Sequence, residues 1–174
     1  MKISKKLKSF NWRFSYMSDE SINKKCDELM EHAKYDEVIE FCDNILKKDQ
    51  NSIDAKINKG YALAFLEKFE SAIECYDQIL KRDLNNSNAL HAKCLALNRL
   101  GKYESAIECS NDILRLDKTN TYALNNKGFA LGRMGKYDEA LECCDEALQV
   151  KSDDQEILKL RNWLKQESES VKQS

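Results

Sequence analysis

Apolar and polar positions along the chain repeat with a period of 34 residues between residues 19 and 154. The clearest copy is GKYESAIEC at residues 101–109, which returns as EKFESAIEC at 67–75, as GKYDEALEC at 135–143 and more faintly as AKYDEVIEF at 33–41. No insertion or deletion separates the copies, which is typical of stacked supersecondary units and not of a single irregular core. The period divides this stretch into four units, 19–52, 53–86, 87–120 and 121–154.

Within each unit the apolar positions predict a helix, a tight turn and a second helix. A leucine recurs on the first helix, and the second helix opens on an aromatic residue that is followed by a small and then a larger apolar residue. In order, these positions hold Leu29, Leu63, Leu97 and Leu131; Tyr35, Phe69, Tyr103 and Tyr137; Val38, Ala72, Ala106 and Ala140; and Ile45, Ile79, Ile113 and Ala147. Such helical steps place the positions on one face of each helix, where the small residues let two helices approach closely.

Turn and cap residues fall between the predicted helices. Gly101 and Gly135 lie where a residue in the left-handed conformation ends a helix at little cost. The first turn of each second helix carries a carboxylate, which the helix dipole favours there. These carboxylates are Asp36, Glu70, Glu104 and Asp138. The polar stretches 49–52, 83–87, 117–121 and 152–154 separate the units and are rich in residues that cap the next helix.

Lysine occupies the same position in every first helix. The four residues are Lys25, Lys59, Lys93 and Lys127. Their stems are expected to cover apolar surface while the ammonium groups reach water. A second interpretation is a column of positive charge that pairs with acids on neighbouring helices, which we rank lower because exposed ion pairs contribute little stability.

The two ends of the chain differ from the repeats. Residues 1–18 carry five bases and no acid, with Ile3, Leu7, Phe10 and Phe14 at helical spacing. This basic amphipathic segment is interpreted as a cap or a loose leader, ahead of a membrane-binding or nucleic-acid-binding arm. Residues 155–168 are predicted to form a C-terminal capping helix with Ile157, Leu160 and Leu164 on one stripe, followed by a frayed tail at 169–174.

Over residues 19–154 the pattern resembles the tetratricopeptide repeat family. The family's eighth position is small, and its twentieth is alanine. Here these positions hold Cys26, Gly60, Cys94 and Gly128, then Ala72, Ala106 and Ala140. The resemblance implies an all-α, right-handed superhelical solenoid of four helix-turn-helix units with a C-terminal capping helix. Two features depart from the family: the closing proline is replaced by Gln50, Leu84, Lys118 and Ser152, and the aromatic near the start of the first helix by Ile22, Lys56, Leu90 and Leu124.

Composition and motifs point away from catalysis. The chain is 42% apolar and 33% charged, without proline, a membrane-spanning run or a secretory signal, so a cytoplasmic protein is expected. Its seven cysteines sit at repeat-related positions without CxxC spacing and are interpreted as reduced packing residues. His91 and Cys94 form the only metal-like pair and lack further ligands. No nucleophile motif or phosphate-binding loop is present. We therefore expect no enzyme activity, no cofactor and no metal.

The resemblance also implies a concave groove lined by the first helix of each unit. Carried onto this sequence, the groove residues are Ile57, Asn58, Tyr61, Phe65, His91, Leu95, Asn98, Arg99, Tyr122, Asn125, Asn126, Phe129 and Arg133, with Asp54 and Asn88 beside them and Asn23, Lys24, Asp27 and Glu31 from the first unit. A row of asparagines offers donors and acceptors for the backbone of an extended peptide. The aromatic and apolar members are expected to form pockets for its side chains.

These residues predict a non-enzymatic scaffold that binds a peptide or helix of a partner protein. One subfamily holds a terminal carboxylate of a chaperone with Lys, Asn and Arg at fixed groove positions. Here the corresponding fifth and ninth positions read Asn23 and Asp27, then Ile57 and Tyr61, then His91 and Leu95, so chaperone-tail binding is not expected. The alternative is a membrane or nucleic-acid adaptor acting through residues 1–18, and a third possibility is that this segment occupies the chain's own groove. Self-association is compatible with each of these three alternatives.

Overall fold

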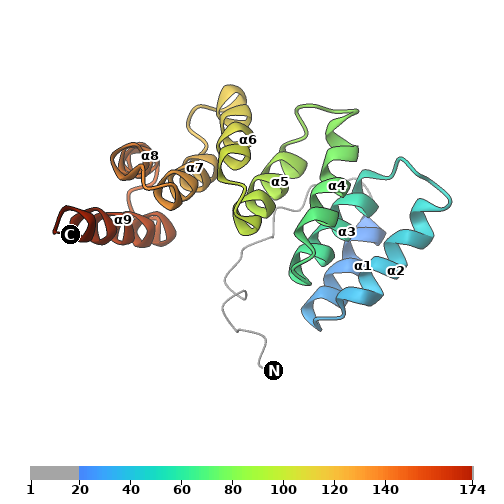
Figure 1. Ribbon diagram of the computed structural model, residues 1–174. Helices are drawn as coiled ribbons and strands as arrows, with labels where there is room; N and C mark the ends of the chain where they lie inside the picture. The colour runs from blue at the N-terminus through green and yellow to red at the C-terminus, as the bar shows by residue number, and fades with distance from the viewer. Residues whose placement is uncertain (1–19, 174) are drawn as a thin grey trace.

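The computed structural model describes residues 20–173, which form nine α-helices and no strand (Figure 1). The helices are α1 (Glu20–Glu31), α2 (Tyr35–Leu46), α3 (Ile53–Phe65), α4 (Phe69–Leu80), α5 (Ser87–Leu100), α6 (Tyr103–Leu116), α7 (Thr121–Arg133), α8 (Tyr137–Val150) and α9 (Gln155–Gln173). The predicted all-α repeat solenoid is confirmed, with two helices in each 34-residue unit. The basic segment 1–18 lies outside the described residues.

The stack curves towards its first helices. In sequence order, α1, α3, α5, α7 and α9 each pack against the next, and every second helix packs between the first helices that precede and follow it. Among residues 20–173 the second helices α2, α4, α6 and α8 do not pack against one another. Because successive first helices contact one another and successive second helices do not, the first helices lie on the inside of the curve. Figure 1 shows the helix pairs following one another in this order. We call the exposed side of α1, α3, α5, α7 and α9 the inner surface.

Each unit turns between its helices through one residue in the left-handed conformation. Gly101 and Gly135 have φ of 81° and 79°, as their sequence positions predicted. The same position holds Ala33 at φ 56° and Glu67 at φ 60° in the first two units. In all four units the next amide bonds back to the recurring leucine of the first helix, with N···O distances of 2.9–3.0 Å. This six-residue closure requires positive φ whatever residue is present.

We expect Glu67→Gly to stabilise the protein by about 0.5–1 kcal/mol, because a non-glycine residue pays about 1–2 kcal/mol for the left-handed conformation while glycine pays mainly chain entropy. Urea unfolding of the variant measures this. The matched control is Glu74→Gly, also at an exposed glutamate but within α4, which should destabilise by about 1 kcal/mol. A Glu67→Gly variant that is no more stable than the parent would show that the backbone of Glu67 is not strained.

The polar stretches between units cap the following helices, as the sequence predicted. Side-chain oxygens of Ser52, Asn86 and Asn120 accept hydrogen bonds from the third amide of the next helix at 3.3, 3.1 and 3.0 Å. Three residues upstream, aspartates tighten the turns that lead into these caps. Asp49, Asp83 and Asp117 accept from backbone amides two residues on. The capping satisfies amides that a helix start otherwise leaves unpaired.

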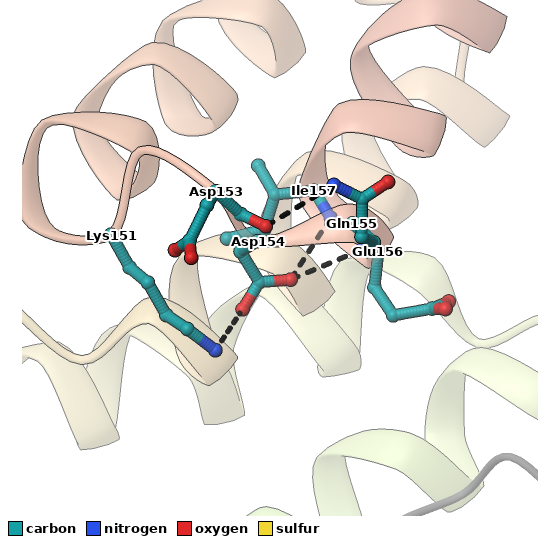
Figure 2. A network of polar contacts seen from close by, with 6 residues as sticks. All are labelled: Lys151, Asp153, Asp154, Gln155, Glu156 and Ile157. Atoms are coloured by element: carbon teal, nitrogen blue, oxygen red, sulfur yellow. Dashed lines mark hydrogen bonds and ion pairs between the residues drawn. The ribbon is translucent and has the colours of Figure 1, made fainter.

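The fourth of these turns is capped by a carboxylate. Asp154 Oδ1 accepts from the backbone amides of Glu156 at 3.1 Å and Ile157 at 3.4 Å, and its other oxygen accepts from Lys151 Nζ at 3.0 Å (Figure 2). Burial acts to raise the pKa of Asp154, but these hydrogen bonds outweigh it and the pKa is lowered. Because the charged form is favoured in the folded protein, the stability that this cap contributes is present above the ordinary aspartate pKa and is lost as the pH falls through the lowered pKa of Asp154.

The C-terminal helix is longer than predicted. The sequence predicted a helix at 155–168 and a frayed tail, whereas α9 continues to Gln173. Leu164 is fully buried and Ser168, four residues on along the same face, is 9% exposed. The polar composition of 169–174 predicts fraying, but no glycine or proline interrupts the chain there, and polar residues do not by themselves end a helix.

The two helices of each unit meet at a pair of facing positions, sixteen residues apart, that differ in size from unit to unit. In the first unit Cys26 Sγ and Cys42 Sγ are 3.8 Å apart, and in the third Cys94 Sγ lies 2.9 Å from Ser110 Oγ. In the second unit Gly60 faces the ring of Tyr76, which is 1% exposed. All seven cysteines are buried free thiols, consistent with packing residues.

Two of the four recurring lysines pair with acids of the preceding unit. Lys59 Nζ lies 2.5 Å from Asp43 and Lys93 Nζ 2.6 Å from Asp77, in each case sixteen residues back on the second helix. Burial lowers the pKa of Lys59, but the hydrogen bond and the charge of Asp43 outweigh it and the pKa is raised. In this register Lys127 has Asn111 in place of an acid. The pairing interpretation, ranked second from the sequence, therefore describes Lys59 and Lys93.

Candidate functional site

An apolar stripe follows the inner surface along the ninth position of the first helices. It comprises Tyr61 of α3, Leu95 of α5, Phe129 of α7 and Trp163 of α9, spaced 34 residues apart. Phe129 is 37% exposed and its ring lies 6.2 Å from that of Trp163, at 31°. The site predicted from sequence omitted Trp163, because α9 was interpreted only as a cap. Counting 34 residues on from Phe129 would have found it.

The asparagines do not form the free row that the sequence predicted. Asn58, Asn98 and Asn126 are 6%, 5% and 6% exposed. Asn58 Nδ2 donates to Asn23 Oδ1 on α1 at 2.7 Å and to the carbonyl of Asp54 at 2.9 Å. Asn23 in turn donates to the Asp54 carboxylate at 3.2 Å. The amide of Asn58 is therefore occupied in joining α1 to α3.

A second asparagine tie joins α5 to α7. Asn98 Nδ2 donates to both the carbonyl and the side-chain oxygen of Asn126, each at 3.1 Å. Asn126 Nδ2 donates to the carbonyl of Tyr122 at 2.9 Å. These bonds orient both amides, because rotating either by half a turn would place two oxygens against each other. Asn98 and Asn126 therefore hold neighbouring first helices in register.

Three buried polar atoms between α5 and α7 have no hydrogen-bond partner. Over residues 20–173 these are His91 Nε2, Asn98 Oδ1 and Asn125 Oδ1. Leaving such an atom unpaired costs about 1–3 kcal/mol. The two asparagine oxygens accept hydrogen bonds and cannot donate them. All three atoms are buried, so a ligand on the inner surface cannot reach them, and their cost falls on the fold itself.

His91 and Tyr122 form a contact between the same two helices. Their ring centroids lie 4.9 Å apart, with the planes tilted by 47°. Burial lowers the pKa of His91, against the opposing charge of Asp117, and burial raises the pKa of Tyr122. Burial also raises the pKa of Tyr61 to about 12. The histidine and both tyrosines are thus uncharged at neutral pH.

Two of the three thirteenth-position residues contact the preceding unit. Phe65 stacks on Tyr35 with centroids 5.0 Å apart and planes 2° apart. Arg133 Nε donates to the Tyr103 hydroxyl at 3.1 Å, and its guanidinium lies 5.9 Å from the centre of that ring. Arg99, at the same position on α5, is exposed. Phe65 and Arg133 therefore join successive units.

The remaining predicted residues divide between core and surface. Ile57 is 8% exposed and belongs to the core between α3 and its neighbours, so it is not accessible to a ligand. Leu95 and Asn125 are half-buried on the inner surface. His91 and Cys94 face different neighbours, since Cys94 bonds to Ser110 while His91 contacts Tyr122.

Within 20–173 no group of three His, Cys, Asp or Glu side chains is placed to hold a metal ion. None of the helices there is long and apolar enough to span a membrane. A hollow on α4 and the turn after it is lined by Glu74, Asp77, Gln78, Leu80, Lys81 and Leu84. It lies on a second helix and is separate from the inner surface.

Comparison with known families identifies the repeat. Two sequence models described as tetratricopeptide repeat match residues 53–86 and 121–154, the second and fourth units. No curated protein has a significantly matching sequence.

Solved structures of similar fold include tetratricopeptide repeat domains. MamA from Desulfovibrio magneticus RS-1, from residue 41 to its end, is 15% identical over 90% of this chain and 90% of that chain, with a TM-score of 0.75. The second tetratricopeptide repeat domain of human RPAP3, in complex with the HSP70 peptide SGPTIEEVD, is 24% identical over 63% of this chain and 92% of that chain (TM-score 0.60). The first such domain of Spaghetti (RPAP3), bound to the HSP90 peptide SRMEEVD, is 23% identical over 68% and 94% (TM-score 0.62). At these identities the likeness is one of fold.

Proposed function

The chain is a tetratricopeptide repeat protein, and on this premise we propose that it is an interaction scaffold whose inner surface binds a peptide segment or helix of another protein. The observation that carries the proposal is the apolar stripe, above all the exposed Phe129 ring beside Trp163. An exposed aromatic residue is not needed to fold a helix, and aromatic anchors contribute much of the energy of protein interfaces.

The side chains of the inner surface limit the class of peptide that it can bind. Two of the similar domains are bound to chaperone peptides that end in EEVD. In this chain the groove positions that hold a terminal carboxylate in one subfamily carry Ile57 and Tyr61 in α3 and His91 and Leu95 in α5. None of these side chains is positively charged at neutral pH, because burial lowers the pKa of His91. An acidic chaperone tail is therefore not the ligand we propose.

We expect Phe129→Ala to weaken binding of the partner by about tenfold or more, because truncating an anchoring aromatic removes its contact with the ligand. Partners are captured from native lysate with the intact chain and identified by mass spectrometry, and the affinity of each purified partner is then measured by titration. The matched control is Leu84→Ala, which removes a side chain that is 78% exposed near α4, away from the inner surface. Circular dichroism verifies that both variants are folded.

Equal affinity of the parent and Phe129→Ala would contradict binding at the apolar stripe. If that binding also fell steeply between low and moderate salt, the partner would be held by charge, as expected for the basic segment 1–18. Loss of affinity in Leu84→Ala alone would instead place the working surface on the second helices.

A further inference from the structure

Two cysteines meet in the first unit, on the helices α1 and α2. Cys26 Sγ and Cys42 Sγ are 3.8 Å apart, and both side chains are fully buried. We propose that this pair is a site of reversible oxidation, at which a disulfide ties α1 to α2. Closing the bond requires the two sulfurs to approach to about 2.05 Å, a small movement for side chains that already touch.

The first unit differs from the others at these facing positions. The corresponding pairs are Gly60 and Tyr76, Cys94 and Ser110, and Gly128 and Cys144. Cys94 and Cys109 also interact, but other groups hold both sulfurs. Cys94 lies 2.9 Å from the Ser110 hydroxyl, and Cys109 donates to the carbonyl of Leu90 at 3.3 Å. Cys94 and Cys109 therefore serve as an internal reference pair in the middle of the stack.

Position in the stack makes the first pair the more reactive of the two. Within residues 20–173, α1 packs only on α2 and α3, whereas α5 packs on α3, α4, α6 and α7. A helix that packs on two neighbours opens at a lower free-energy cost than a helix that packs on four. In the closed state the hydrogen bond that the Cys42 thiol makes to Cys26, together with burial, raises the pKa of Cys42 and keeps it unreactive. Reaction therefore follows the opening of α1, which returns the thiols to water.

The oxidant is a peroxide. In the open state the thiolate of one cysteine attacks an oxygen of hydrogen peroxide, which breaks the O–O bond and gives a sulfenic acid and hydroxide. The second thiol attacks the sulfenic sulfur, the S–S bond forms, and water leaves with the remaining protons. In total two thiols and one hydrogen peroxide give one disulfide and two waters. A small dithiol reverses the reaction by thiol–disulfide exchange.

The disulfide would act on the inner surface through α1. Asn23 on α1 accepts from Asn58 at 2.7 Å and donates to Asp54 at 3.2 Å, which positions the polar groups at this end of α3. Each opening of α1 breaks both bonds. Linking residues 26 and 42 closes a short loop and should slow amide hydrogen exchange in α1 by about a hundredfold.

The test treats the native full-length chain with hydrogen peroxide, blocks free thiols with N-ethylmaleimide and maps linked peptides by mass spectrometry. We expect a Cys26–Cys42 link that forms about tenfold or more faster than any Cys94–Cys109 link, disappears with dithiothreitol and slows exchange in α1. The matched control is Cys42→Ser, which places at this position the residue that the third unit has in Ser110. It should fold, form no link and leave exchange in α1 unchanged by peroxide.

Three results would overturn the proposal. They are sulfinic acid at Cys26 or Cys42 without a link, a Cys94–Cys109 link formed as fast or faster, and no link under conditions that give one in urea-unfolded protein. Unchanged exchange in α1 after the link has formed would reject its effect on the helix.

Discussion

Replacing Gly60 by cysteine is expected to lower the free energy of unfolding by about 2–3 kcal/mol, since extra atoms in a close-packed core force side chains out of their preferred conformations. A Cβ at residue 60 would overlap Cε1 of Tyr76 and lie 2.8 Å from its Cζ. The Tyr76 side chain is 1% exposed, so its ring cannot turn aside into solvent. The first and third units carry cysteine here because their facing residues, Cys42 and Ser110, are small.

A smaller residue at position 76 should restore part of the stability that Gly60→Cys loses. We expect Tyr76→Ser alone to cost about 3–5 kcal/mol through the cavity that it leaves, and the Gly60→Cys, Tyr76→Ser double variant to cost at least about 1 kcal/mol less than the sum of the two. The double variant reproduces the Cys94 and Ser110 pair of the third unit. Urea unfolding of the four proteins gives the coupling energy. Additive losses would mean that the two positions do not share one packing space.

The second large effect is expected at the C-terminal end. Leu164→Ala should destabilise the protein by about 2–5 kcal/mol, the range for truncating a buried leucine. Leu164 is fully buried, and its Cδ2 fills the space above Gly132 that a Cβ would otherwise take. Without the Leu164 side chain α9 should detach from α7 and α8, so the C-terminal end of the stack should unfold before the middle units do.

Amide hydrogen exchange shows which helices lose stability when Leu164 is truncated. In Leu164→Ala the amides of α9 and α7 should lose protection first, while those of α3 and α5 keep it. The control Lys165→Ala removes the adjacent, exposed side chain and should change stability by less than about 0.5 kcal/mol. Uniform loss of protection along the chain would show that the units unfold together, in which case α9 is part of one cooperative core.

The sequence by itself determined the features that depend on local chemistry. The 34-residue period defined the units, and the aromatic residues at 35, 69, 103 and 137 begin the second helices as predicted. Gly101 and Gly135 marked the left-handed turns, and the polar stretches marked the caps. These features follow from backbone preference and helical periodicity, which act within a few residues. They can therefore be predicted from the sequence of a single unit.

The tertiary structure alone decided which of the inner-surface residues remain free. Periodicity places Asn98, Phe65 and Phe129 on a face but does not show which group of the adjacent unit each one meets. Asn98 is bonded to Asn126, Phe65 is stacked on Tyr35, and Phe129 stays exposed beside Trp163. Availability for a partner depends on contacts between residues about 30 positions apart, and the spacing between stacked helices sets those contacts.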